Sequence, residues 1–181
     1  MHSKPAIRLL DAGEMRRDRG ALAALLADAV RGGASVGFMA PVDAAALDAY
    51  WDGIAEEVAD GARTCLAAWL DDALVGTVQL APCGKPNQPH RADVQKLLVH
   101  PAARRRGIGT ALMQALERHA LAERRVLLTL DTRTGSDADR HYRGWGWSPI
   151  GVVPGYAYDP DGTLADCTFY FKQLAPVHPH A

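Results

Sequence analysis

The stretch Val99-His-Pro-Ala-Ala-Arg-Arg-Arg-Gly-Ile-Gly-Thr110 joins an apolar segment to a segment with helical periodicity. The residues before it, 92–99, are predicted to form a strand, and residues 107–122 are predicted to form a helix of about fifteen residues. A continuous apolar run follows within residues 126–131, which is typical of a buried strand. A strand, a helix and a strand in this order form a right-handed crossover, so the two strands should be parallel neighbours.

The same stretch has the composition of an anion-binding loop. The start of a helix leaves backbone N–H groups unpaired at the positive end of the helix dipole. Gly107 and Gly109 would let an anion approach this backbone closely, and three arginines add positive charge. The spacing fits neither a Walker loop nor a GxGxxG motif, and the alternative is a tight turn with an exposed basic flank. The residues predicted to hold the anion, a pyrophosphate, are Arg104, Arg105, Arg106, Gly107, Ile108, Gly109 and Thr110.

The alternation of side chains changes phase inside residues 92–99. Ala92 and Val94 occupy one set of alternate positions, whereas Leu97 and Val99 occupy the other set. A slip of one residue within a strand is what a β-bulge produces, so we predict a bulge here. The alternative is a strand whose carboxyl-terminal end is buried on both faces.

The rest of the chain alternates between helix and strand patterns. Apolar residues at three- and four-residue spacing predict helices over 15–31, between Asp43 and Gly61, and over 136–145. Further strands are predicted at residues 7–10, 63–70, 74–80, 147–153 and 168–174. The order β-α-α-β-β-β-α-β-α-β-β predicts an α/β fold with one central, mixed, twisted sheet of about six to seven strands. Residues 1–5 and 176–181 are predicted to be tails.

Length and composition limit the class of protein. The chain has 181 residues, so we expect a single domain over residues 1–181 with its core at about 6–174. Hydrophobic residues are 48% and charged residues 23% of the chain, which excludes global disorder. A net charge of -1 argues against a nucleic-acid-binding or membrane-binding protein, because both kinds of partner favour a basic surplus.

The cysteines and the absence of metal motifs indicate a compartment and a chemistry. Cys65, Cys83 and Cys167 are odd in number and show no CxxC spacing, so neither a disulfide framework nor a thiolate zinc site is expected. No HExxH or EF-hand pattern appears, and we expect no metal. No apolar run approaches the length of a membrane span. These features favour a cytoplasmic protein.

Two motifs in the chain together resemble those of the GCN5-related N-acetyltransferase (GNAT) family. The segment Arg104-x-x-Gly107-x-Gly109 is similar to the family's R/Q-x-x-G-x-G/A motif. The family's second motif, A-x-x-x-Y-x-x-x-G-(aromatic), is matched by Ala138, Tyr142, Gly146 and Trp147. The resemblance implies the family's fold, with helices on both faces of the sheet and a splayed parallel strand pair. The family often has Asn where this chain has Gly135, so that contact is not expected, and Ser136 is predicted to cap the next helix.

The resemblance implies acetyl-CoA as cosubstrate. In the family, backbone amides of the loop hold the pyrophosphate, and the pantetheine arm enters between the splayed strands. The main-chain groups that would pair with this arm belong here to Leu97, Leu98 and Val99, and one N–H would polarise the thioester carbonyl. The implied reaction is direct transfer of the acetyl group to an amine, because nothing in the chain suggests a covalent acyl-enzyme.

Three residues are candidates for proton transfer. Tyr142 stands at the family's tyrosine position and could donate a proton to the departing sulfur, and the alternative is a core tyrosine. Asp131, at the end of a buried strand, and Asp93, before the predicted bulge, are the candidate bases, with Asp131 slightly favoured. Either carboxylate could instead cap a turn or a helix. We expect Asp131 and Tyr142 to contact acetyl-CoA as well.

A closer likeness concerns the acceptor. Residues 32–39, 93–97, 130–132, 154–157 and 160–162 resemble the tabtoxin-resistance type of acetyltransferase, which implies a small-molecule amine acceptor such as a toxin or an antibiotic. Phe38, in the loop after the first helix, and Tyr156, in a predicted turn at 154–156, are predicted to bind this acceptor. A protein or peptide N-acetyltransferase and a non-catalytic acyl-CoA sensor are the open alternatives. A homodimer is also open.

Overall fold

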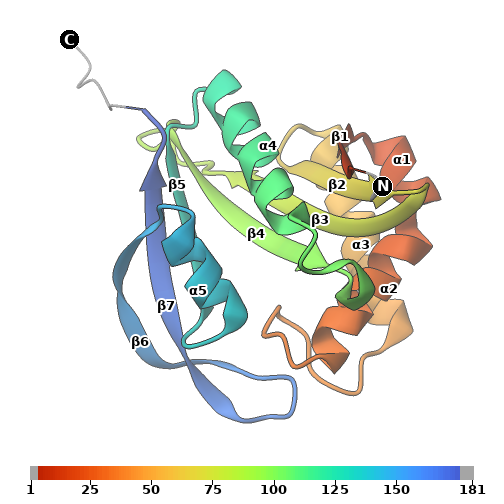
Figure 1. Cartoon of the computed structure of the whole chain (residues 1–181). Helices are drawn as coiled ribbons and strands as arrows, with labels where there is room; N and C mark the ends of the chain where they lie inside the picture. Colours follow the sequence, from red (N-terminus) through yellow and green to blue (C-terminus); the bar gives the residue numbers. More distant parts are fainter. Residues whose placement is uncertain (1–3, 176–181) are drawn as a thin grey trace.

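The computed structural model describes residues 4–175, which form one seven-stranded sheet flanked by helices (Figure 1). The strands are β1 (Ala6–Leu10), β2 (Thr64–Leu70), β3 (Ala73–Pro82), β4 (Arg91–Val99), β5 (Leu127–Arg133), β6 (Ser148–Tyr158) and β7 (Leu164–Gln173). The α-helices are α1 (Ala12–Arg17), α2 (Arg19–Arg31), α3 (Ala44–Ala59), α4 (Ile108–Ala122) and α5 (Asp137–Gly144). The strand order is β1-β2-β3-β4-β5-β7-β6, and β4 and β5 are parallel, which confirms the predicted α/β fold with a mixed sheet.

Two hydrophobic cores lie on opposite faces of the sheet. Helices α1, α2 and α3 cover one face, and α4 and α5 cover the other (Figure 1). Strand β2 contributes side chains to both cores, because successive residues of a strand point to opposite faces of the sheet. Leu66 and Ala68 belong to the core under α4, whereas Cys65 and Ala67 belong to the core under α1–α3. Helices on both faces are therefore confirmed.

The predicted bulge lies in the middle of β4. Gln79 of β3 pairs with Gln95 and Thr77 pairs with Leu98, so β4 holds one extra residue between these two pairs. Lys96, at the bulge, has a left-handed backbone with φ 50°. Strands β4 and β5 pair only from Arg91 to Asp93, and Figure 1 shows them diverging beyond that point. The splayed parallel pair is confirmed.

The first helical region differs from its prediction. A capping box formed by Asp11 and Glu14 begins the helix at Ala12, earlier than the predicted residue 15. The backbone then leaves helical geometry at Asp18, with φ -95° and ψ 9°, and this break divides the region into α1 and α2. Ser136 does cap α5 as predicted, because its Oγ accepts a hydrogen bond from Asp139 N at 3.1 Å.

The prediction of a turn at residues 154–156 is wrong. These residues lie inside β6, where the register with β7 shifts between Val153 and Ala157. The Gly155 N–H donates to Asp166 Oδ1 at 2.8 Å, which holds this irregular part of the strand against β7. The turn between the two strands follows at residues 159–162 instead, where Gly162 N donates to the Asp159 carbonyl oxygen.

The outer parts of the predicted tails, residues 1–3 and 176–181, lie outside the described residues. Residues 4 and 5 precede β1, and residue 175 follows β7. Within residues 4–175, none of the helices has the length and apolar character that a membrane crossing requires.

Close packing at Gly76 of β3 gives a test of how tightly α4 is held on the sheet. A Cβ atom there would lie 3.0 Å from the Leu98 carbonyl oxygen and 3.1 Å from Leu112 Cδ1. Gly76→Ala should therefore lower the free energy of unfolding by about 1–3 kcal/mol, a usual cost of overpacking. Gly53→Ala in α3 is the matched control, because a Cβ atom there meets nothing within 4 Å. This substitution should raise the free energy of unfolding by about 0.5–1 kcal/mol. Urea denaturation measures both, and equal effects would contradict tight packing at Gly76.

Candidate active site

The loop between β4 and α4 is an open turn with a high positive charge. Arg104 Nε donates to the Val99 carbonyl oxygen at 3.2 Å, which ties the loop to the end of β4. The residues Arg104, Arg105 and Arg106 are all exposed. Gly107 precedes the first residue of α4 with φ 74°, and a Cβ atom on it would meet nothing within 4 Å. The backbone at the start of α4 is thus accessible, as an anion-binding turn requires.

The next three residues begin the helix and face the protein more than solvent. A Cβ atom at Gly109 would lie 3.4 Å from Trp145 Cη2, so this glycine lets α4 pack against the end of α5. That Gly109 lets an anion approach the backbone stays a prediction. Ile108 is buried in the core and Thr110 is half-buried. Their contribution to an anion site would come from backbone N–H groups, which have no intrahelical partner in a first turn.

Leu97, Leu98 and Val99 follow the bulge of β4. The side chain of Leu98 is buried in the core under α1–α3, whereas Leu97 and Val99 pack partly against the core under α4. Because β4 and β5 stop pairing after Asp93, main-chain groups of these residues that point toward β5 have no strand partner there. Backbone N–H and C=O groups are stabilised by hydrogen bonds, and a ligand between the strands could supply the partner.

Tyr142 of α5 lies in an aromatic cluster. The centroid of its ring is 5.8 Å from Trp145, 5.8 Å from Trp147 and 6.0 Å from Tyr170. The residue is buried, yet its hydroxyl makes no hydrogen bond with the part of the chain that the structure describes. Burial raises the pKa of this hydroxyl, and the negative charge of Asp131 raises it further. The phenol is therefore protonated near neutral pH and has a proton to donate.

Asp131 lies on the opposite face of the sheet from Tyr142. Leu128 and Leu130 of β5 are buried under α4, so the alternating side chain of Asp131 points to the other face, where it reaches solvent. The negative charge of Asp131 contributes to the raised pKa of Tyr142, although the two side chains lie on opposite faces of the sheet. The roles of both residues in proton transfer stay predictions.

The electrostatic surroundings of Asp131 make its carboxylate a better base. Partial burial raises the pKa of Asp131, the positive charge of Lys96 opposes this rise, and the negative charge of Asp93 adds to it. The net pKa is raised from its usual value. A carboxylate with a raised pKa accepts a proton more readily near neutral pH.

Asp93, the other candidate base, is already engaged. Arg91 Nη1 donates to Asp93 Oδ1 at 2.9 Å, and the Thr129 hydroxyl donates to the same oxygen. These contacts fix Asp93 at the last pair between β4 and β5. Asp131, by contrast, makes no ion pair or hydrogen bond with another side chain within residues 4–175.

The two segments predicted to bind the acceptor meet at one side of the sheet. Ala40 N donates to the Pro160 carbonyl oxygen at 2.9 Å, and Ser35 Oγ donates to the Tyr158 carbonyl oxygen at 3.2 Å. The loop after α2 is thereby joined to the turn between β6 and β7 (Figure 1). Next to this junction is a cavity of about 580 Å³, whose lining includes Val30, Gly33, Arg133, Ser136 and Asp159.

Phe38 and Tyr156 come from these two segments and pack on different aromatic neighbours. Phe38 is edge-on to Tyr50 of α3 with ring centroids 5.5 Å apart, and Tyr156 is edge-on to Phe169 with centroids 4.9 Å apart. Phe169 is the register partner of Asp131, so Tyr156 lies on the same face of the sheet as the candidate base. Tyr156 remains 51% exposed, which leaves it free to contact a ligand.

Lys96 and Tyr50 also belong to this side of the molecule, although no motif pointed to them. Lys96 Nζ lies 5.4 Å from the centroid of the Tyr50 ring, and Tyr50 Oη donates to Gln79 Oε1 at 3.1 Å. A bulge redirects the side chain of its extra residue, so the phase slip in residues 92–99 is the signal that could have identified Lys96. Tyr50 lies at a position that the apolar spacing of α3 assigns to the core, so the sequence does not mark it as a site residue.

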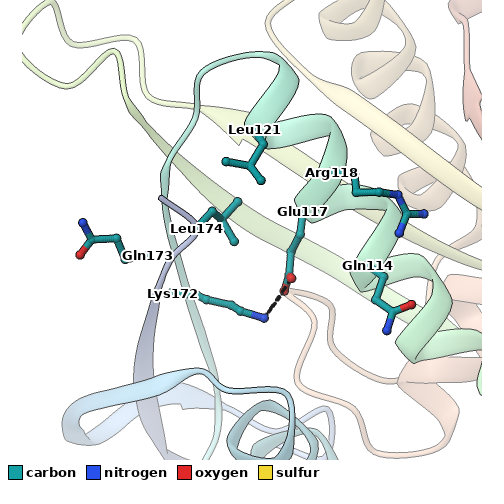
Figure 2. A pocket seen from close by; sticks show the side chains of 7 residues that line it. All are labelled: Gln114, Glu117, Arg118, Leu121, Lys172, Gln173 and Leu174. Atoms are coloured by element: carbon teal, nitrogen blue, oxygen red, sulfur yellow. Dashed lines mark hydrogen bonds and ion pairs between the residues drawn. The ribbon is translucent and has the colours of Figure 1, made fainter. Parts of the chain in front are cut away.

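A second cavity lies between α4 and the end of β7 (Figure 2). It has a volume of about 350 Å³, and Lys172 Nζ forms an ion pair there with Glu117 Oε1 at 2.8 Å. None of the predicted site residues lines it. Within residues 4–175, no cluster of three or more His, Cys, Asp or Glu side chains could hold a metal ion.

Known proteins resemble the chain in both sequence and fold. Residues 17–147 match the Acetyltransferase (GNAT) family. An uncharacterized N-acetyltransferase of Azospirillum brasilense, from the hisH-hisA intergenic region, is 32% identical over 108 residues. The match covers 59% of this chain and 62% of that relative, so the chain spans less than two thirds of the relative's length.

Solved structures extend the likeness to the whole fold. Salmonella typhimurium yncA, with its cofactor acetyl-CoA, gives a TM-score of 0.80 at 19% identity and covers 99% of both chains. A ribosomal-protein-alanine N-acetyltransferase of Brucella melitensis gives a TM-score of 0.78 at 23% identity and covers 93% of this chain and 99% of that chain. At these identities the likeness concerns the fold alone. With the match over residues 17–147, the chain belongs to the acetyltransferase (GNAT) family, a family of acyltransferases that use acetyl-CoA.

Proposed function

We propose that this chain is an acetyl-CoA-dependent N-acetyltransferase whose acceptor is the amine of a small molecule. The observation that carries the proposal is the divergence of β4 and β5 after Asp93. Tyr142 lies on one face of the sheet and Asp131 on the other, and the charge of Asp131 contributes to the raised pKa of Tyr142. An acid and a base on either side of a strand opening suit a reaction between two substrates that enter from opposite faces.

The residues at the opening suit acetyl-CoA. When bound, acetyl-CoA supplies a thioester whose acetyl group can be transferred. The backbone N–H groups after Gly107 and the side chains of Arg104, Arg105 and Arg106 would hold its pyrophosphate. The main-chain groups of Leu97, Leu98 and Val99 that point toward the opening would hold the pantetheine arm, and one N–H would polarise the thioester carbonyl.

Asp131 and Tyr142 would move the protons of the reaction. Asp131 takes a proton from the acceptor ammonium, directly or through a water, and leaves a neutral amine. The amine nitrogen then bonds to the acetyl carbon while the carbon–sulfur bond breaks, and Tyr142 donates its proton to the leaving sulfur. The nitrogen releases its second proton as the amide forms, and this proton restores the Tyr142 hydroxyl through solvent. The raised pKa of Tyr142 keeps it protonated before this step, and the raised pKa of Asp131 strengthens it as a base.

A small acceptor is favoured by the contacts between the two acceptor segments. The loop after α2 and the turn between β6 and β7 are joined by the hydrogen bonds of Ala40 to Pro160 and of Ser35 to Tyr158. These two segments would form the walls of the acceptor site, and a peptide would need to pass between them. Phe38 and Tyr156 would contact the acceptor from the two walls. The sequence likeness of both segments to the tabtoxin-resistance type extends the proposal to an amine-bearing toxin or antibiotic.

Strand β6 would be the contact in a homodimer. It is the edge strand of the sheet, and it exposes Ile150, Val152 and Tyr158 by 64%, 49% and 58%. An edge strand with exposed apolar side chains is suited to pairing with a second copy of the same strand.

We also assign the enzyme to the cytoplasm, because its three cysteines are unpaired thiols.

Release of CoA thiol from acetyl-CoA, measured with a panel of small amines and a matched panel of short peptides, tests the proposal. Small amines should give CoA together with an N-acetylated product in mass spectrometry, and peptides should give neither, because the joined loops exclude them. Turnover of peptides alone would reassign the acceptor class. Binding of acetyl-CoA without turnover of any amine would indicate a sensor and contradict the proposal.

Tyr142→Phe removes the proposed acid and leaves the ring in its aromatic cluster. The variant should keep the wild-type affinity for acetyl-CoA while kcat falls by about 10²-fold, a usual effect of losing a general acid. Stopped-flow measurement of the chemical step separates this effect from product release. An unchanged rate of chemistry would reduce Tyr142 to a packing residue.

Gly107→Val should weaken the binding of acetyl-CoA by at least about tenfold, or 1.4 kcal/mol, because the branched side chain would occupy the open side of the turn. Gly61→Val is the matched control. Gly61 also has a left-handed backbone, with φ 71°, and a Cβ atom there also meets nothing within 4 Å. Both variants should therefore lose similar stability, and calorimetry should find weaker binding in Gly107→Val alone. Equal affinities in the two variants would exclude this turn as the pyrophosphate site.

The dependence of kcat/KM on pH should report Asp131. Activity should fall as pH drops through the raised pKa of Asp131, because the carboxylate is a base only above that pKa. Asp131→Asn should remove this acid limb. Asp93→Asn should move the limb to lower pH, because the charge of Asp93 raises the pKa of Asp131. If Asp131→Asn keeps the wild-type limb, the base is another group.

A further inference from the structure

Lys96 has an unusual position for a lysine. It is the residue at the β4 bulge, its backbone is left-handed with φ 50°, and its side chain is half-buried. Its Nζ lies over the ring of Tyr50 at 5.4 Å, and a Cβ atom added to Gly37 would lie 3.8 Å from it. The ammonium group is therefore held between α3 and the loop after α2, on the side where Phe38 lies.

The charge of Lys96 has no direct partner. Within residues 4–175 it forms no ion pair or hydrogen bond, whereas neighbouring Arg63 is paired with Glu57 at 2.7 Å and donates to Gln95 at 2.8 Å. Burial and the charge of Arg63 lower the pKa of Lys96, and the charge of Asp131 opposes this. A half-buried ammonium without a carboxylate is costly, and the face of the Tyr50 ring offsets part of that cost.

We propose that the acceptor carries a carboxylate as well as the amine that is acetylated, and that Lys96 binds this carboxylate. The inference rests on the proposed function, since the amine has to lie at Asp131 for its proton to be removed. Lys96, whose ammonium lies over Tyr50 of α3, and Asp131, whose side chain points away from the core under α4, lie on the same face of the sheet, and neither forms an ion pair within residues 4–175. An aminocarboxylate matches both charges, whereas a diamine would bring a second cation toward Lys96 and Arg63.

The position of Lys96 is fixed by its surroundings before any ligand binds. Tyr50, under the ammonium, is held by its hydrogen bond to the buried Gln79 at 3.1 Å and by the edge-on contact with Phe38. A charge held in this way binds a carboxylate without losing much side-chain freedom. Tyr50 thus acts as a positioning residue for Lys96.

Matched pairs of amines test the inference, each pair consisting of an amino acid and its carboxamide. For the wild-type enzyme we expect the KM of the acid to be lower than that of the carboxamide. Lys96→Met should raise the KM of the acid by roughly 10- to 100-fold, as expected for a lost charged hydrogen bond, and leave that of the carboxamide nearly unchanged. Lys96→Arg should keep most of the preference. Lys85→Met, in the exposed loop between β3 and β4, is the control and should change neither constant.

The ratio of the two KM values separates this inference from the proposed function. Any effect of Lys96→Met on Asp131, on folding or on acetyl-CoA binding changes both members of a pair and cancels in the ratio. Transfer to amines without a preference for the acids, or a preference that survives Lys96→Met, would overturn the inference and leave the N-acetyltransferase proposal standing. No CoA release with any amine would overturn both.

Discussion

The bulge at Lys96 follows from the burial of two residues of β4 in different cores. Val94 is buried under α4 and Leu98 is buried under α1–α3, although an even separation of four residues would put both on one face of a regular strand. One extra residue resolves the conflict. Burying Val94 and Leu98 contributes about 1.5–3 kcal/mol each, whereas a left-handed Lys96 costs about 1–2 kcal/mol, so the bulge is favoured.

The bulge determines which groups can meet. Strand β4 diverges from β5 after Asp93, so main-chain groups of Leu97–Val99 that point toward β5 have no strand partner there. Asp131 follows the last β4–β5 pair on β5, and its charge contributes to the raised pKa of Tyr142 on the other face of the sheet. Close packing of Gly76 against Leu98 and Leu112 holds α4 beside the opening, so the arginine-rich turn stays at the end of β4.

Features that depend on a local sequence pattern could be predicted from the sequence. Fewer of the features that depend on contacts between distant residues could be predicted. The phase slip in residues 92–99 predicted the bulge, and helical spacing predicted α4 at its observed length. The capping box of Asp11 and Glu14 is a local signal that would have corrected the start of the first helix. Residues 154–156 were predicted as a turn because Pro-Gly favours turns, but pairing with β7 and the contact to Asp166 keep them in the strand.

The sequence favoured Asp131 over Asp93 only slightly as the candidate base, because both carboxylates follow apolar strand residues. The choice depends on contacts across the sheet, where Arg91 and Thr129 occupy Asp93 while Asp131 stays free. Asp93 still acts on the proposed chemistry through its charge, which raises the pKa of Asp131, and Lys96 acts in the opposite sense. A carboxylate ligand on Lys96 would screen that opposing charge, whereas the ammonium group of the same ligand would lower the pKa of Asp131. The two ends of the acceptor would therefore act on the candidate base in opposite senses.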